Sequence, residues 1–479
     1  MRLLIGILLA AAAAAPSAWQ RASRPPAPTF SETIAPIVFS NCVSCHRAGE
    51  AAPFTLTSYE DVAKRAALIA KVTESRYMPP WKAVKGHGEF KDERGLTDAQ
   101  IASIREWVKA GVPRGDATKM PPLPTFTDGW QLGKPDLILE MPIEYTVPAS
   151  GPDIYRNFAI PTGLTEDKWV RAVEFRPSAR RAVHHALFSF VRGGAVAALE
   201  GRGGQPGFGG AMPVALVPGF QPAGELGTWA VGTTTREFPG GIARRLAKNS
   251  DLVAQMHFHP TGKPQVERST VGIYFADGPP DRRVMTPAVP GLFGFLKGID
   301  IPPGEKAYTI RATLPIGRDT QVLSIAAHAH YLGKEIKADA TLPDGTIKPL
   351  LWIQDWDFNW QDRYDYKEPV LLPKGTRIDV SITYDNSADN PHNPCNPPRR
   401  VRWGLQSFDE MGSVSFMMLL VNAAEQEQAQ QQAAAGLKQA LSNAMENDTV
   451  KRYMAEQKRF LEDPAREGAD PCVARQLED

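Results

Sequence analysis

The stretch Val322-Leu-Ser-Ile-Ala-Ala-His328-Ala-His330 joins an apolar run typical of a buried strand to two histidines spaced two residues apart. Side chains at positions i and i+2 of a strand share a face, so both imidazoles can bind one ion. Runs of this kind, rich in β-branched and aromatic residues and separated by Gly/Pro turns, recur at Leu252–Phe258, Gly272–Phe275, Thr309–Leu314, Val322–Ala326, Arg377–Tyr384 and Ser413–Val421. The pattern predicts β-sandwiches, and its length favours two of them, at residues 136–287 and 288–422.

The segments on either side of this region are expected to be helical. In the segment 30–117, Thr97 can cap a helix that contains Ile104 and Trp107. The segment 423–479 is rich in Ala, Gln and Glu and predicts a helical C-terminal tail. The expected fold class is therefore multidomain: a small all-α domain, two all-β jelly-roll sandwiches and a helical tail.

Composition and the N-terminal sequence bear on binding partners and on location. The chain has 479 residues, with 54 basic and 53 acidic side chains, so no basic field predicts nucleic-acid binding. Residues 1–22, with Arg2 followed by an apolar run, predict an export signal peptide. No later apolar run is long enough to span a membrane. We therefore expect a periplasmic or secreted mature protein without a membrane span, in which Cys395 and Cys472 can form a disulfide.

The sequence Cys42-Val-Ser-Cys45-His46 is a haem c attachment motif. Its two thiols form thioethers to the haem, and the adjacent imidazole binds the iron from one side. A redox-active cysteine pair is the alternative, but no thioredoxin-like βαβ pattern surrounds this motif. Met78, in Tyr77-Met-Pro-Pro-Trp81, is the favoured second axial ligand, and His87 is the rival. The segment 30–117 resembles the class I cytochrome c fold.

Histidines form three further groups, at His184-His185, His257-Phe-His259 and His328-Ala-His330. Adjacent histidines point to opposite faces of a regular strand, so His184 and His185 can share an ion only at a bulge or a strand end. A polar residue near the surface is the simpler interpretation of any single histidine. Three groups in one chain favour metal binding, and the addition of Met411 favours copper, because a thioether is a soft ligand while zinc would normally add Cys or carboxylate.

These motifs, in this order, resemble the copper type II, ascorbate-dependent monooxygenases, which include peptidylglycine α-hydroxylating monooxygenase and dopamine β-monooxygenase. The resemblance covers roughly residues 136–422. It rests on four segments that match the family's ligand blocks, at Val183-His-His-Ala-Leu187, Gln255-Met-His257-Phe258, Ala327-His-Ala-His-Tyr-Leu-Gly-Lys334 and Asp409-Glu-Met411.

The resemblance implies two copper ions on two sandwiches that face each other across a wet cleft. His184, His185 and His257 would bind the electron-transfer copper. His328, His330 and Met411 would bind the copper that meets O2, and would be the catalytic residues. His259 has no ligand role in this scheme, and it can orient a neighbouring ligand or cap a turn.

The expected function is hydroxylation of a C–H bond of a small organic substrate with O2. Electrons would come from a periplasmic donor through the haem, with ascorbate as a further reductant. Ala326 and Ser415 stand where the peptide-hydroxylating branch has Arg and Tyr, which argues against a peptide ending in glycine as substrate. Two alternatives remain: a non-catalytic haem/copper electron carrier or copper-binding protein, and a haem-linked binding module without copper.

Overall fold

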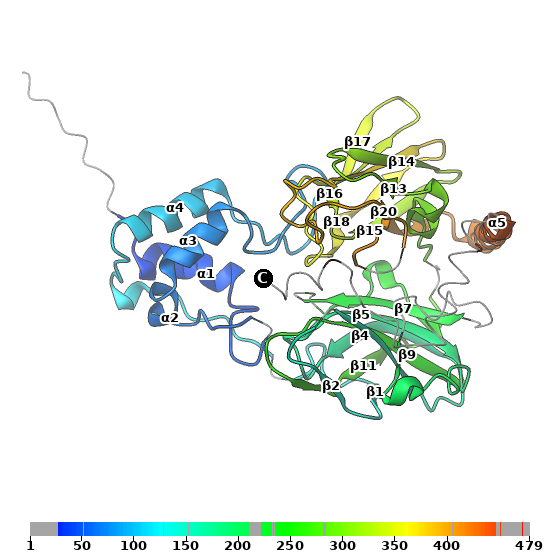
Figure 1. Ribbon diagram of the computed structural model, residues 1–479, viewed down its shortest axis with the longest axis horizontal. Coiled ribbons are helices and arrows are strands. Elements are labelled where there is room, and N and C mark those ends of the chain that lie inside the picture. Colours follow the sequence, from blue (N-terminus) through cyan, green and yellow to red (C-terminus); the bar gives the residue numbers. More distant parts are fainter. Residues whose placement is uncertain are drawn as a thin grey trace, which may run out of the picture.

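The structure is a computed structural model of the chain (Figure 1). It describes residues 27–446 except 51, 128, 152, 210–221, 232, 234, 281–283 and 405–406, together with residues 451 and 472. The expected signal peptide and most of the tail beyond residue 446 lie outside the described residues. Among the helices that the structure describes, none is both long enough and apolar enough to cross a membrane.

A small helical unit, formed by residues 30–80 and 95–117, lies to one side of the β-structure (Figure 1). Its elements are a π-helical turn η1 (Phe30–Ile34), α1 (Ala35–Asn41), α2 (Tyr59–Ala63), α3 (Ala66–Glu74) and α4 (Asp98–Lys109). The predicted capping of α4 is confirmed, because Thr97 and Gln100 exchange side-chain and backbone hydrogen bonds. Phe30 and Trp107 are fully buried at the centre of this unit.

The first sandwich consists of two antiparallel sheets with strand orders β1-β11-β4-β8 and β6-β3-β9-β5-β7, and β10 and β2 pair beside them. The bounds are β1 (Leu137–Glu140), β2 (Tyr145–Val147), β3 (Ile154–Pro161), β4 (Lys168–Arg176), β5 (Val183–Arg192), β6 (Phe208–Gly209), β7 (Pro222–Ala230), β8 (Arg244–Leu246), β9 (Ser250–Phe258), β10 (Gln265–Glu267) and β11 (Thr270–Phe275). The expectation of a mainly β chain with a small helical part is confirmed.

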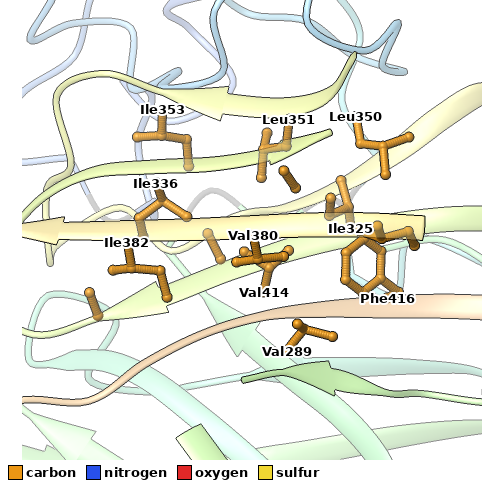
Figure 2. Packing of buried hydrophobic residues seen from close by; sticks show 14 of the residues in the cluster. Val289, Ile325, Ile336, Leu350, Leu351, Ile353, Val380, Ile382, Val414 and Phe416 are labelled. Carbon is orange, nitrogen blue, oxygen red and sulfur yellow. The ribbon is translucent and has the colours of Figure 1, made fainter. Parts of the chain in front are cut away.

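The second sandwich has strand orders β12-β21-β15-β18 and β14-β19-β16-β17, with a short β13-β20 pair. The bounds are β12 (Ala288–Val289), β13 (Asp300–Ile301), β14 (Tyr308–Pro315), β15 (Thr320–Ala329), β16 (Gly333–Thr341), β17 (Ile347–Ile353), β18 (Arg363–Leu372), β19 (Arg377–Tyr384), β20 (Val401–Arg402) and β21 (Gly412–Leu420). Its core lies between the two sheets, where Ile325 and Phe416 face Val380 and Ile336 (Figure 2).

The two sandwiches also share an apolar contact. Leu323, Met417 and Leu419 belong to β15 and β21 of the second sandwich, yet they pack with the core cluster of the first sandwich. β15 is therefore buried on both faces, which explains why its sequence is a nearly continuous apolar run. Each such side chain contributes about 1.5–3 kcal/mol on burial, so this contact holds the sandwiches in a fixed relation.

One segment between α3 and α4 leaves the helical unit and packs on the second sandwich. We call this segment, Trp81–Arg94, the arm. The Val84 N–H donates to the carbonyl of Trp352 on β17 (2.7 Å), and the Lys91 N–H donates to the carbonyl of Asp365 on β18 (2.8 Å). Ala83 and Phe90 are buried in the core cluster of the second sandwich. The predicted domain 30–117 thus contains a part that belongs structurally to another domain.

The arm yields a first prediction. Phe90→Ala is expected to lower the free energy of unfolding by about 3–5 kcal/mol, because it removes a buried aromatic ring that contacts Tyr364 and Tyr366. Tyr77→Ala, outside the arm and 47% exposed, is the control and should change stability by less than about 0.5 kcal/mol. Chemical denaturation measures both variants, and equal stability of the two would show that the arm is not part of the core.

The C-terminal part is joined to the second sandwich at two places. Cys395 and Cys472 form a disulfide, as expected. The predicted tail helix is present as α5 (Gln426–Glu446). Arg318, which precedes β15, forms an ion pair with Glu425 and donates a hydrogen bond to Gln428. The remainder of the predicted tail lies outside the described residues.

Candidate metal centres

Three histidines of the first sandwich converge on one point. The Nδ1 atoms of His184, His185 and His257 lie 3.1, 3.2 and 3.3 Å from one another. Imidazole nitrogens that share an ion at about 2.0–2.1 Å each lie roughly 3.3–3.5 Å apart. Burial lowers the pKa of His184 to about 3 and also lowers the pKa of His185, so both imidazoles are neutral and available as ligands. The residues therefore fit a single metal ion, and we call this group the three-histidine cluster.

The local backbone explains how two adjacent histidines reach the same point. β5 pairs with β9, and the pairing register shifts between Val183 and His185. The shift is an irregularity of the bulge type, which changes the direction of one side chain relative to regular alternation. His257, on β9, is the partner of His185 in this register. The sequence predicted that the two histidines could share an ion only at a bulge or a strand end, and the structure shows such an irregularity between Val183 and His185.

Asp153, which precedes β3, orients the three-histidine cluster from outside. Its carboxylate accepts hydrogen bonds from His257 Nε2 (2.7 Å) and His259 Nδ1 (2.8 Å). Burial raises the pKa of Asp153, but the two histidine hydrogen bonds outweigh it and hold this pKa below its usual value. Carboxylates of this kind fix the tautomer and orientation of a metal-binding imidazole. His259 thus belongs to the support of the cluster, and sequence reasoning missed Asp153.

The second prediction concerns Asp153. Asp153→Asn is expected to lower the affinity of the three-histidine cluster for copper by about 10–100-fold, because the neutral amide holds the Nε2 hydrogen of His257 less strongly. Asp251→Asn, the same change near the start of the β9 strand that carries His257, is the control and should leave the affinity unchanged. Competition titration with a copper chelator measures both variants. Equal affinity in Asp153→Asn would show that the carboxylate does not support a metal ligand.

The second sandwich holds His328 and His330 at the end of β15, with ring centroids 5.1 Å apart. His328 Nδ1 lies 2.6 Å from the side-chain oxygen of Gln361, and His330 Nδ1 lies 3.1 Å from the backbone oxygen of Asp409. Both Nδ1 atoms therefore donate to oxygen, so Nε2 is the nitrogen that each ring could present to a metal. The three-histidine cluster differs, because there the three Nδ1 atoms face the shared point at which a metal could bind.

Glu410 connects these histidines to Met411. Its fully buried carboxyl accepts hydrogen bonds from three backbone N–H groups, those of His330 (3.0 Å), Leu332 (2.6 Å) and Met411 (3.2 Å). Burial raises the pKa of Glu410 to about 8. Because one carboxyl oxygen accepts from both His330 and Met411, the two backbones are held as neighbours. The donor set of two Nε2 atoms and a thioether fits a copper ion.

The Cys42–His46 segment, which predicts haem attachment, lies between α1 and α2, and its two thiols and its imidazole are the groups that a covalent haem requires. His46 Nδ1 lies 3.0 Å from the backbone oxygen of Phe54, which leaves Nε2 for an iron ligand. Cys42 packs against the core of the helical unit, and burial raises the pKa of its thiol to about 12. Burial also raises the pKa of the Cys45 thiol. Neither cysteine forms a disulfide.

The loop after this motif contacts the first sandwich just before the three-histidine cluster. Glu50 forms an ion pair with Arg180 (2.5 Å), and Arg181 donates to the backbone oxygen of Pro53 (3.5 Å). β5 begins two residues later, at Val183. Direct contacts therefore join the loop that follows the Cys42–His46 motif to the residues that precede the paired histidines.

The two candidates for the second axial ligand lie in different surroundings. Met78 is half-buried on the segment between α3 and the arm, and its N–H donates to the backbone oxygen of Val72. His87 lies within the arm, with its ring 4.7 Å from that of Trp352 on β17. His87 thus packs on the second sandwich. Ligation by Met78 stays a prediction.

The chain was compared with known proteins. No family model matches it, and no curated protein matches it. Solved structures with weak similarity include the major capsid protein P2 of bacteriophage PM2 (10% identity, 59% of this chain, 96% of that chain, TM-score 0.23) and PNGF-II (11% identity, 59% of this chain, 65% of that chain, TM-score 0.24). Oxalate decarboxylase of Bacillus subtilis matches with a TM-score of 0.12 (7% identity, 63% of this chain, 80% of that chain). Similarities at these TM-scores carry no argument about this chain.

Proposed function

We propose that the chain is an exported copper-dependent monooxygenase that hydroxylates a C–H bond of a small organic substrate. The observation that carries the proposal is the pair of donor sets on adjoining sandwiches. One set presents three Nδ1 atoms within 3.3 Å of one another, and the other presents two imidazoles, of which His330 has its backbone held next to that of Met411 by Glu410. Three imidazoles alone also suit zinc, so the choice of copper depends on Met411.

Each residue has a defined task in this proposal. His184, His185 and His257 hold one copper, with Asp153 orienting His257. His328, His330 and Met411 hold the other, with Gln361 and Glu410 fixing their orientation. When bound, the two coppers supply one-electron chemistry and O2 activation. The balanced reaction converts R–H, O2, two electrons and two protons into R–OH and water.

The helical unit is proposed to be a cytochrome c that delivers the two electrons. Cys42 and Cys45 would attach the haem, and His46 and Met78 would bind its iron. The ion pair between Glu50 and Arg180 supports this role, because it links the loop after the haem motif to the residues just before β5. The disulfide between Cys395 and Cys472 supports an oxidising compartment, such as the periplasm.

Metal stoichiometry tests the proposal. Protein matured in a bacterial periplasm and titrated with copper should contain one iron and two coppers per chain. It should also form a hydroxylated product from at least one member of a panel of aliphatic and benzylic substrates, with O2 and a reductant. Two coppers without product from a broad panel would instead indicate an electron carrier. The absence of tight copper would leave only a haem-bearing binding module.

A further inference from the structure

The loop between β17 and β18, Gln354–Asp362, lies where the two donor sets meet. Phe358 at its centre is 5% exposed. Its ring centroid lies 5.7 Å from that of His184 and 6.0 Å from that of His257, both in the three-histidine cluster. The same ring lies 5.8 Å from His330 and 4.7 Å from Tyr331, on the second sandwich. One phenyl ring therefore contacts histidines of both donor sets.

The loop that carries Phe358 is held firmly on the side of the second sandwich. Trp356 donates through Nε1 to the backbone oxygen of His330 (3.1 Å), and its N–H donates to the backbone oxygen of Lys334 (2.9 Å). Gln361 donates through Nε2 to the backbone oxygen of Phe358 (3.0 Å), while its side-chain oxygen accepts from His328. Gln361 thus fixes Phe358 and a proposed copper ligand at the same time.

The arm covers the outer side of this loop. Lys82 forms an ion pair with Asp355 (3.0 Å) and lies 3.8 Å from Asp357, while Arg94 pairs with Asp362. Lys82 and Asp357 are 8% and 3% exposed, so dissolved salt screens their attraction less than it would screen a pair on the surface, whereas Asp355 is 82% exposed. The loop is therefore held by the arm on one side and by His328 and His330 on the other.

The sandwiches are also joined beside Phe358. The Tyr155 ring stacks on His257, with centroids 4.4 Å apart and planes 5° apart, and its hydroxyl lies 2.9 Å from the Ser407 hydroxyl of the second sandwich. Since His184 and His330 are each within 6 Å of the Phe358 ring, their own ring centroids lie within about 12 Å of each other, a span that a single phenyl ring can fill.

We infer that Phe358 is a positioning residue that fixes the separation of the two metal centres and excludes water from the space between them. The inference rests on the proposed function, and it differs from the wet cleft implied by the family resemblance. A buried phenyl ring, held by its loop and packed between two pairs of rings, replaces solvent at this point. Removal of the Phe358 ring is expected to let the distance between the two donor sets vary and to admit water between them.

The test uses the full chain loaded with Cu²⁺ alone and measures magnetic dipolar coupling between the two ions by electron paramagnetic resonance. Wild type should show a coupling that the single-site variants His184→Ala and His330→Ala lack. Phe358→Leu should weaken and broaden this coupling and increase the deuterium modulation from D2O, while Phe358→Tyr, which keeps the ring, should retain the wild-type spectrum. Phe416→Leu, a matched change in the core of the second sandwich, is the control for a general loss of packing (Figure 2).

The outcomes are distinct. Two bound coppers with a coupling that changes in Phe358→Leu but not in Phe416→Leu or Phe358→Tyr support the inference. Two bound coppers with the same coupling and the same D2O modulation in Phe358→Leu overturn it and leave the proposed function in place. Equal changes in Phe358→Leu and Phe416→Leu also overturn it, because packing in general would then set the separation. Fewer than two coppers overturn both the inference and the proposed function.

Discussion

Met411→Leu is expected to keep the haem and the copper of the three-histidine cluster and to lose product formation by more than about 100-fold. A direct ligand should cost more than the 10–100-fold typical of residues that only orient a ligand. Leucine has nearly the same volume as methionine, so the swap should cost less than about 1.5 kcal/mol of stability and remove only the thioether. The measurement is product formed per haem, together with copper content.

Met418→Leu is the matched control for this experiment. Met418 is buried on β21, seven positions after Met411, and belongs to the core of the second sandwich. The Met418→Leu variant should retain wild-type copper content and product formation. Full activity in Met411→Leu would remove Met411 from the site and, with it, the main reason for choosing copper over zinc.

Glu410→Ala is expected to lower the free energy of unfolding by at least about 3 kcal/mol, because three buried N–H groups lose their acceptor and each unsatisfied donor costs about 1–3 kcal/mol. The variant should also bind one copper fewer, since the backbones of His330 and Met411 are no longer held together. Glu410→Gln keeps an acceptor oxygen and should recover part of both losses.

Denaturant titration and copper analysis measure these effects. Glu368→Ala, on the exposed face of β18, should change stability by less than about 0.5 kcal/mol. If Glu410→Ala loses stability but binds two coppers with wild-type affinity, Glu410 supports the fold and does not organise a metal site. If Glu410→Ala keeps both its stability and its two coppers, the three hydrogen bonds to Glu410 contribute little to the stability of the folded state.

Much of the secondary structure could be predicted because its signals are local. The run Arg377–Tyr384 coincides with β19, and Thr97 marks the start of α4 as an N-cap residue should. The separation into two sandwiches followed from the length of the β-region. The arm escaped prediction, because nothing in the local pattern of Trp81–Arg94 distinguishes a segment that packs on a distant sheet from one that packs within its own domain.

Residue type and spacing were enough to predict the candidate metal ligands, but not the residues and backbone irregularities that bring them together. The convergence of His184 with His185 depends on a register shift in β5, which side-chain pattern does not reveal. Asp153 is 104 positions from His257 and occurs in no motif, so only the fold brings them together. Phe358 lies in a tryptophan-rich segment that reads as ordinary aromatic core, and its contacts to both donor sets exist only in the tertiary structure.

The arm determines the order in which the chain can be completed. Lys82 and its partner Asp355 are separated by 273 residues, and synthesis proceeds from the N-terminus. The attachment motif at Cys42 and Cys45 therefore emerges long before the strands on which the arm packs. During that interval the core of the helical unit can already form, while Trp81 and Phe90 of the arm still lack the sheets on which they pack. A fragment that ends at residue 117 would therefore contain the arm without the sheets on which it packs, and Phe90 would lose its buried contacts with Tyr364 and Tyr366.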